Sequence, residues 1–216
     1  MEDVLKKLFD AVLEGNFEGV KSNLQAALDA KLDPTVILND GMIAAMSEVG
    51  CRFEAGEYYV PEMLIAARAM QTGLAILKPH LQQTDRKSSG KVVIGTVKGD
   101  LHDIGKNLVA LMLEGAGFEI IDLGVDVSAD KFVEVARNIK PDVVALSALL
   151  TTTMPSMKTT LDALTAAGLR NNIKVIVGGA PVTEAYAQQI EADGFSTDAS
   201  RAVNVVKSLL AGGLSD

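Results

Sequence analysis

The chain has 216 residues, of which 48% are hydrophobic and 22% are charged, and its formal net charge is −8. This composition is typical of a folded globular protein, and the length suits one large domain or two smaller ones. The negative charge would repel phosphate backbones, so nucleic acid is not expected as a partner. No stretch approaches the roughly 18 apolar residues of a membrane span, and the first residues lack a signal-peptide pattern. We therefore expect a cytoplasmic protein with no membrane partner.

The first part of the chain, residues 1–81, has helical periodicity. Four helices are expected, at residues 2–15, 17–32, 35–51 and 62–77. Asp33 and Pro34 mark the start of the third, since aspartate is a good N-cap and proline suits the first helical position. Pro79 is expected to lie beyond the end of the fourth helix. The short connections predict an antiparallel four-helix bundle.

Residues 82–90 are polar and without periodicity, and we interpret them as a linker. In residues 91–216, β-branched runs alternate with helical patterns. Strands are expected at 91–97, 118–122, 142–146, 174–177 and 194–196, and helices at 104–114, 129–138, 156–167, 183–191 and 199–210. Several strands are continuous apolar runs, as in buried parallel sheets. This part is therefore expected to be a Rossmann-like α/β domain, a doubly wound parallel sheet of five strands in flavodoxin-like order, which binds ligands beyond the carboxyl ends of its strands.

His102 is the most informative residue, because it follows the first expected strand on a strand-to-helix loop. Imidazole is a good ligand for transition metals, and its second nitrogen commonly donates to a carboxylate, here Asp100. A protein zinc site needs three or four protein ligands, whereas the chain has two histidines and one cysteine, Cys51, far apart in sequence. A single imidazole suits a metal held by a macrocycle. Haem and a corrinoid both meet that description.

Other candidate residues also follow the ends of expected strands. Gly105, Gly178 and Gly179 would permit a ligand to approach the backbone closely, although glycines are common in such loops. The hydroxyl run from Thr151 to Thr153 has two interpretations: it supplies hydrogen-bond donors to a ligand, or it caps the helix that contains Pro155.

Three motifs together carry a resemblance. Asp100-x-His102-x-x-Gly105 is followed after 41 residues by Ser147-x-Leu149, and after 28 more by Gly178-Gly179. This spacing resembles the B12-binding domain of methionine synthase and of corrinoid methyltransferase proteins. That family also places a four-helix cap first, and a Gly-x-aromatic-x-x-Pro motif similar to residues 56–61 leads into the last helix of that cap. Over its whole length the chain is similar to the small corrinoid subunits of methanol-, methylamine- and methoxyaromatic-type methyltransferase systems.

The resemblance implies a base-off, His-on cobalamin or related corrinoid, with His102 as the lower ligand of cobalt. Asp100 would be the hydrogen-bond partner of His102, and Thr153 would lie where methionine synthase has a serine in the same relay. The nucleotide tail would pass Ser147, Leu149 and the two glycines, while the cap would cover the methyl face. The residues expected to bind the cofactor are Asp100, His102, Asp103, Ile104, Gly105, Ser147, Leu149, Thr151, Thr153, Gly178, Gly179, Tyr59 and Met63.

The implied function is that of a methyl carrier. Co(I) would accept a methyl group from a substrate-specific methyltransferase, and methyl-Co(III) would pass it to a second methyltransferase that acts on tetrahydrofolate or a thiol. A reductive activase is a third implied partner, and the chain is not expected to be catalytic by itself. For Tyr59 and Met63, an ordinary place in the bundle core is the alternative to covering the cofactor.

Three other functions are alternatives to a methyl carrier. A cobalamin-dependent sensor or regulator is the main alternative, but no helix-turn-helix or basic face precedes the B12-like domain. A mutase small subunit would normally lack the helical cap. A plain flavodoxin-like or receiver domain leaves the spacing of the three motifs unexplained.

Overall fold

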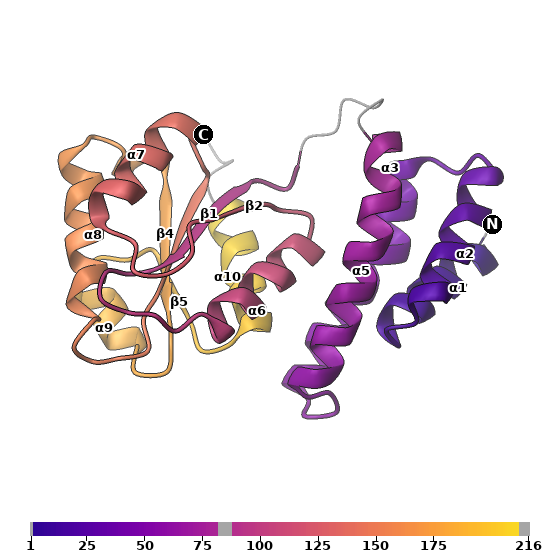
Figure 1. Ribbon diagram of the computed structural model, residues 1–216, viewed down its shortest axis with the longest axis horizontal. Coiled ribbons are helices and arrows are strands. Elements are labelled where there is room, and N and C mark those ends of the chain that lie inside the picture. Colours follow the sequence, from indigo (N-terminus) through magenta and orange to yellow (C-terminus); the bar gives the residue numbers. More distant parts are fainter. Residues whose placement is uncertain (1, 82–87, 212–216) are drawn as a thin grey trace. The chain divides into compact units, whose positions relative to one another are not determined.

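The computed structural model describes residues 2–81 and 88–211, and the chain divides into two compact units (Figure 1). The first unit takes Met1–Lys87 and Gly115–Gly117, and the second takes Ser88–Glu114 and Phe118–Asp216. The proposed linker at 82–90 lies mostly outside the described residues. In the described part of the chain, no helix combines the length and the apolar character that crossing a membrane requires.

The first unit is entirely helical. Its elements are α1 (Glu2–Leu13), α2 (Phe17–Asp29), α3 (Pro34–Val36), a π-helical segment (Ile37–Ile43), α4 (Ala44–Glu54) and α5 (Val60–Leu81). The segments from Pro34 to Glu54 follow one another without a break, so the four expected helical stretches are present. Apolar side chains at helical spacing, such as Leu8, Leu24 and Met46, are buried between them.

The start of α3 lies where the local sequence predicts it, whereas the end of α5 does not. Asp33 caps α3 by accepting a hydrogen bond from the Thr35 amide at 2.6 Å, with Pro34 in the first turn, as expected. The prediction that the last helix ends before Pro79 was wrong, because α5 continues to Leu81. Pro79 cannot donate the helical hydrogen bond to the carbonyl four residues earlier, and α5 ends two residues after it.

The second unit is a parallel sheet of five strands with helices on both faces. The strands are β1 (Lys91–Thr96), β2 (Glu119–Asp122), β3 (Val143–Ser147), β4 (Lys174–Gly178) and β5 (Gly194–Ser196), in the order β2-β1-β3-β4-β5. The helices are α6 (Ile104–Gly115), α7 (Ala129–Ile139), α8 (Pro155–Ala166), α9 (Glu184–Gln189) and α10 (Ala199–Ala211). A short 3-10 helix, Arg170–Asn172, precedes β4. The expected flavodoxin-like order is confirmed.

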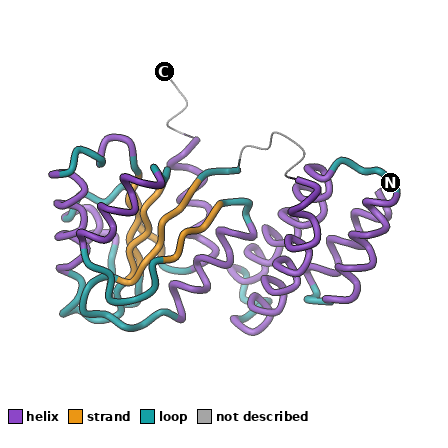
Figure 2. Tube along the Cα trace, turned by 45° about the horizontal axis from the view of Figure 1, so that its top comes forward, coloured by secondary structure: helices purple, strands orange, loops and turns teal. Residues whose placement is uncertain are grey.

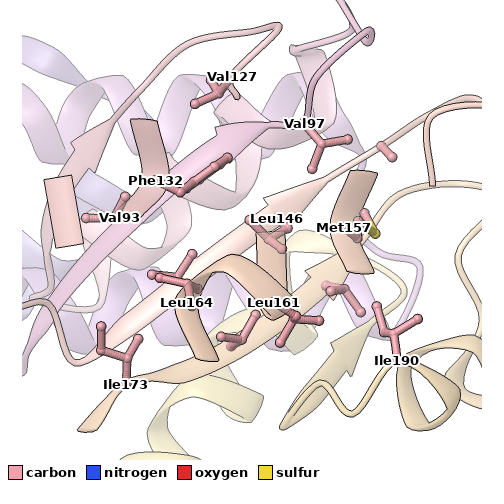
Figure 3. Close-up of a cluster of buried hydrophobic side chains, with 14 of the residues drawn as sticks. Val93, Val97, Val127, Phe132, Leu146, Met157, Leu161, Leu164, Ile173 and Ile190 are labelled. Carbon is pink, nitrogen blue, oxygen red and sulfur yellow. The ribbon is translucent and has the colours of Figure 1, made fainter. Parts of the chain in front are cut away.

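Two layers of helices enclose this sheet (Figure 2). In Figure 1, α7, α8 and α9 lie on one face, and α6 and α10 lie on the other. Figure 3 shows the core of the first face, where Val93 and Leu146 from the sheet meet Phe132 of α7 and Leu161 of α8. Gly95 of β1 is required there, because a Cβ at this position would lie 2.8 Å from the Phe132 ring. β1, β3 and β4 are buried along most of their length, as their continuous apolar runs predict, whereas the edge strand β2 is partly exposed.

Candidate functional site

The candidate site lies at the carboxyl ends of β1, β3 and β4. The register pairs Thr96 with Ser147, and Ser147 with Gly178, so the last residues of the three strands form one row. The β1–β3 boundary is the switch point of the sheet, because β2 extends it on one side and β4 on the other. The topology thereby brings together three motifs that are 41 and 28 residues apart in sequence.

A tight turn directs the chain out of β1 toward His102. The Asp100 amide donates to the Val97 carbonyl at 3.1 Å, and Gly99 has a φ of +86°, which glycine adopts without strain. The hydroxyl of Thr96 donates to the His102 carbonyl at 2.9 Å. These bonds fix the loop just before α6, and the His102 side chain is 51% exposed at its surface.

Asp100 and His102 form a hydrogen-bonded pair. Nδ1 of His102 lies 2.7 Å from Oδ1 of Asp100, which also accepts the His102 amide at 3.1 Å. A carboxylate at Nδ1 holds the proton on that nitrogen, which leaves Nε2 as the ring nitrogen able to bind a metal. The pair predicted from the sequence is therefore present with the tautomer that a metal ligand needs.

The second oxygen of Asp100 is held from β3. Oδ2 accepts hydrogen bonds from the Leu149 amide at 2.7 Å, the Leu150 amide at 3.2 Å and the Thr153 hydroxyl at 2.7 Å. Burial of Asp100 by itself raises the pKa of the carboxyl. The hydrogen bonds from Thr153, His102 and the Leu149 amide outweigh it, so the pKa of Asp100 lies far below its ordinary value. Asp100 is a fully buried carboxylate that stays ionised.

Thr153 supports Asp100 and does not cap the following helix. Its Oγ1 lies within hydrogen-bond distance of Asp100 Oδ2 and of the Leu150 carbonyl at 2.8 Å, and it has one proton to donate. The N-cap position of α8 is Met154, which makes no side-chain capping bond. The capping alternative is therefore not what the structure shows for Thr153. Thr151 is exposed on the same turn and is not joined to the Asp100 pair.

The three glycines differ in the space around them. A Cβ at Gly179, where φ is +130°, would lie 1.9 Å from the Ala148 carbonyl oxygen, and one at Gly178 would lie 3.1 Å from the Ser196 carbonyl oxygen. These two glycines are therefore needed for the close packing of the β3, β4 and β5 ends. A Cβ at Gly105 would meet nothing within 4 Å, so the space beside the first turn of α6 is open.

Two large apolar side chains near His102 in the sequence are exposed, and so is Leu149 after β3. The exposed fraction is 70% for Leu101, 83% for Ile104 and 42% for Leu149. Apolar groups clustered at a surface commonly mark a binding site. Asp103 differs from its neighbours, because its carboxylate accepts a bond from the Asn107 amide group at 3.1 Å within α6. Ser147 is half-buried at the end of β3.

The two cap residues lie in different environments. Tyr59 is 66% exposed just before α5, whereas Met63 is completely buried. Met63 has the burial expected of a bundle core residue, the alternative considered for it. Both residues remain predicted cofactor contacts.

Sequence reasoning did not identify Thr96 and Asp126 as part of the site. Thr96 ends an ordinary strand, and Asp126 lies in the loop after β2, 26 residues from Asp100 in sequence. Asp126 contacts the turn at Gly99 through a side-chain hydrogen bond of 2.8 Å. The only local signal for Asp126 was its place as a polar residue after Gly124 and Val125, and polar residues are common in loops.

The donor set fits a metal that brings most of its own ligands. Within residues 2–81 and 88–211, no three histidine, cysteine or acidic residues are grouped so as to hold a metal ion. His102 offers one oriented nitrogen, with exposed Leu101 and Ile104 beside it and open space at Gly105. These features fit a large, partly apolar macrocycle with a central metal.

Comparison with known proteins identifies the family to which this chain belongs. The B12 binding domain family matches residues 90–204, and a second B12 binding domain family matches residues 4–78. The chain belongs to the B12-binding family. A trimethylamine corrinoid protein of Methanosarcina acetivorans is 43% identical over 97% of each chain.

Two solved structures support the same family assignment. A chain of the methanol:cobalamin methyltransferase complex of Methanosarcina barkeri has a TM-score of 0.88 and 30% identity, covering 98% of this chain and 81% of that one. A cobalamin-binding protein of Desulfitobacterium hafniense has a TM-score of 0.80 and 37% identity, covering 94% and 97%. The expected fold, family and corrinoid cofactor are confirmed, while the residue roles and the His-on mode stay predictions.

Proposed function

We propose that this chain is the methyl-carrying corrinoid subunit of a methyltransferase system whose donor is a methylated amine. The observation that carries the proposal is the Thr153–Asp100–His102 hydrogen-bond chain at the carboxyl edge of the sheet. The donor class is supported by the trimethylamine corrinoid protein at 43% identity, compared with 30% for the methanol system chain. The lower ligand would be His102 in a base-off, His-on complex.

A bound corrinoid supplies a cobalt ion that can take up and release a methyl group. The protein contributes orientation and proton control. Asp100 keeps the proton of His102 on Nδ1 whenever Nε2 ligates, because its ionised carboxylate accepts from that nitrogen. The half-exposed His102 side chain would present Nε2 to the cobalt, while Nδ1 stays bonded to Asp100.

Thr153 and the amides of Leu149 and Leu150 keep Asp100 in place while His102 changes state. They all donate to Oδ2, so Oδ1 remains directed to His102. Gly178 and Gly179 would border the path of the nucleotide tail, together with Ser147 and Leu149.

The helical unit, residues 1–81, would act as a cap that covers the methyl face through residues such as Tyr59. Residues 82–90 would serve as the hinge that lets the cap move when a partner enzyme approaches. The partners would be a substrate-specific methyltransferase, a second methyltransferase that acts on tetrahydrofolate or a thiol, and a reductive activase. We place this exchange in the cytoplasm.

A methylation assay tests the proposal. The full chain is loaded with hydroxocobalamin, reduced, and incubated with a trimethylamine or dimethylamine methyltransferase and its substrate, while the corrinoid absorbance is followed. We expect methylation with the amine enzymes and little with a methanol enzyme. Loss of methylation with every donor enzyme, together with light-dependent oligomerisation, would instead favour the cobalamin sensor.

A further inference from the structure

Asp126 contacts three consecutive residues of the turn that precedes His102. Its carboxylate accepts a hydrogen bond from the Gly99 amide at 2.8 Å and pairs with the Lys98 ammonium at 3.0 Å. Its own amide donates to the Asp100 carbonyl at 2.9 Å. These bonds join the loop after β2 to the turn after β1. Of the residues they hold, only Asp100 belongs to the three sequence motifs, and Asp126 itself lies outside all three.

The backbone of Asp126 is in an uncommon conformation that makes these contacts possible. Its φ is +54°, in the left-handed region that non-glycine residues rarely adopt, although aspartate and asparagine tolerate it better than most. In this conformation the amide and the carboxylate of one residue both reach the turn. Backbone strain of this kind persists where surrounding structure holds it, and it occurs often at functional sites.

The turn determines where the Asp100 side chain lies. It is closed by the bond from the Asp100 amide to Val97, with Gly99 at φ +86°. The Gly99 amide lies within this turn, and Asp126 is the acceptor that satisfies it. The pKa of Asp126 is lowered, mainly by this amide and by Lys98, so the acceptor is charged. Charged acceptors form stronger hydrogen bonds than neutral ones.

We propose that Asp126 is a positioning residue for the cobalt ligand, holding the turn from Lys98 to Asp100 so that Asp100 orients His102. The inference rests on the proposed function, because it assumes that His102 ligates the corrinoid. The Gly99 contact is the essential one. Lys98 is an exposed partner, and exposed ion pairs contribute little.

Asp126→Gly and Asp126→Asn separate the carboxylate from the backbone. Glycine adopts a φ of +54° without strain and keeps the amide bond to Asp100, so this variant removes only the side chain. Asparagine keeps an acceptor for the Gly99 amide and loses only the charge. Asp162→Ala is the matched control, because it removes an exposed aspartate that pairs with Lys158 on α8.

The readout is the electron paramagnetic resonance spectrum of each full-length variant loaded with cobalamin and reduced to the Co(II) state. Each protein carries ¹⁵N-labelled histidine, so the two-line splitting of an axial imidazole reports the fraction of His-on cofactor and is distinct from the three-line ¹⁴N splitting of the cofactor's own base. For Asp126→Gly we expect the His-on to His-off ratio to fall about tenfold, the lower end of the loss seen when outer partners of a metal ligand are removed. Asp126→Asn and Asp162→Ala should stay within about twofold of the wild type.

The experiment distinguishes failure of the proposed function from failure of the positioning role of Asp126. A wild-type spectrum without imidazole splitting overturns the proposed function. A wild-type spectrum with splitting, together with an unchanged ratio in Asp126→Gly, overturns the positioning role alone. Thermal melting followed by circular dichroism establishes that each variant is folded. Should Asp126→Gly be unfolded at 25 °C, Asp126→Ser replaces it under the same criterion, since its shorter side chain does not reproduce the carboxylate contacts.

Discussion

The carboxylate of Asp100 joins the two strand ends that build the site, because Oδ1 is bonded to His102 after β1 and Oδ2 to Thr153 after β3. Both side-chain distances are 2.7 Å. The two oxygens are therefore committed to different tasks. One oxygen orients the imidazole, and the other fixes the carboxylate to the neighbouring loop.

Replacing Asp100 by asparagine should weaken the His-on state. One amide atom of the new side chain would be a nitrogen that cannot accept the hydrogen bonds now made to a carboxylate oxygen. We expect the His-on to His-off ratio of the loaded protein to fall by about 10- to 100-fold, the usual loss for an outer partner of a metal ligand. Absorbance spectra of the Co(II) form measure this ratio. An Asp100→Asn protein with the wild-type ratio would contradict the assigned role.

Stability of the cofactor-free protein should depend on pH through Asp100. The folded-state pKa is lowered, so the ionised group stabilises the fold above the unfolded pKa of about 3.9, and this contribution is lost as pH falls below it. At neutral pH we expect Asp100→Asn to lower the unfolding free energy by about 1–3 kcal/mol, because buried donors lose their acceptor. Urea denaturation of both proteins should show the difference shrinking below about pH 4. A constant difference from pH 7 to pH 3 would exclude an ionised Asp100.

Thr153 provides a conservative pair of variants. Thr153→Val removes the hydroxyl at almost constant volume and should cost about 1–2 kcal/mol, since one hydrogen bond to a buried charge is lost. Thr153→Ser keeps the hydroxyl and should lose less. Urea midpoints of the two variants test this. Equal stability of Val and Ser variants would mean that the hydroxyl contributes nothing to holding Asp100.

The glycines at the site are expected to respond in opposite ways to alanine. Gly179→Ala should destabilise the fold by several kcal/mol, of order 3, because φ is +130° and the new Cβ would overlap the Ala148 carbonyl. Gly105→Ala should leave stability unchanged or raise it by up to about 1 kcal/mol, since alanine favours helices. Thermal melting measures both effects.

Gly105→Ala also tests the close approach of the cofactor. Its Cβ would enter the open space beside α6, so we expect weaker binding of hydroxocobalamin in equilibrium dialysis despite unchanged folding. Gly168→Ala is not a suitable control, because Gly168 has a φ of +71°. Asp162→Ala, at an exposed position of α8 outside the three motifs, is the comparison. Wild-type affinity in Gly105→Ala would remove Gly105 from the cofactor site.

Local sequence patterns predicted the sheet because β1, β3 and β4 are continuous apolar runs bounded by polar loops. They also located the Asp100–His102 pair, since these residues are adjacent along the chain and their bonding geometry is local. The extension of α5 past Pro79 was missed, because proline was expected to end the helix before itself, whereas α5 continues for two more residues. The bonds from Asp126 and Thr96 were missed because they depend on how loops meet in space, which no local periodicity encodes.

The most direct test of the account is the origin of the axial nitrogen. The full chain is prepared with ¹⁵N-labelled histidine, loaded with cobalamin and reduced to Co(II), and its electron paramagnetic resonance spectrum is compared with that of the unlabelled protein. The account predicts that each three-line splitting by ¹⁴N becomes a two-line splitting by ¹⁵N, and that this two-line splitting is lost in His102→Ala. A wild-type splitting that ignores the label, or a two-line splitting that survives in labelled His102→Ala, would show that another nitrogen ligates the cobalt.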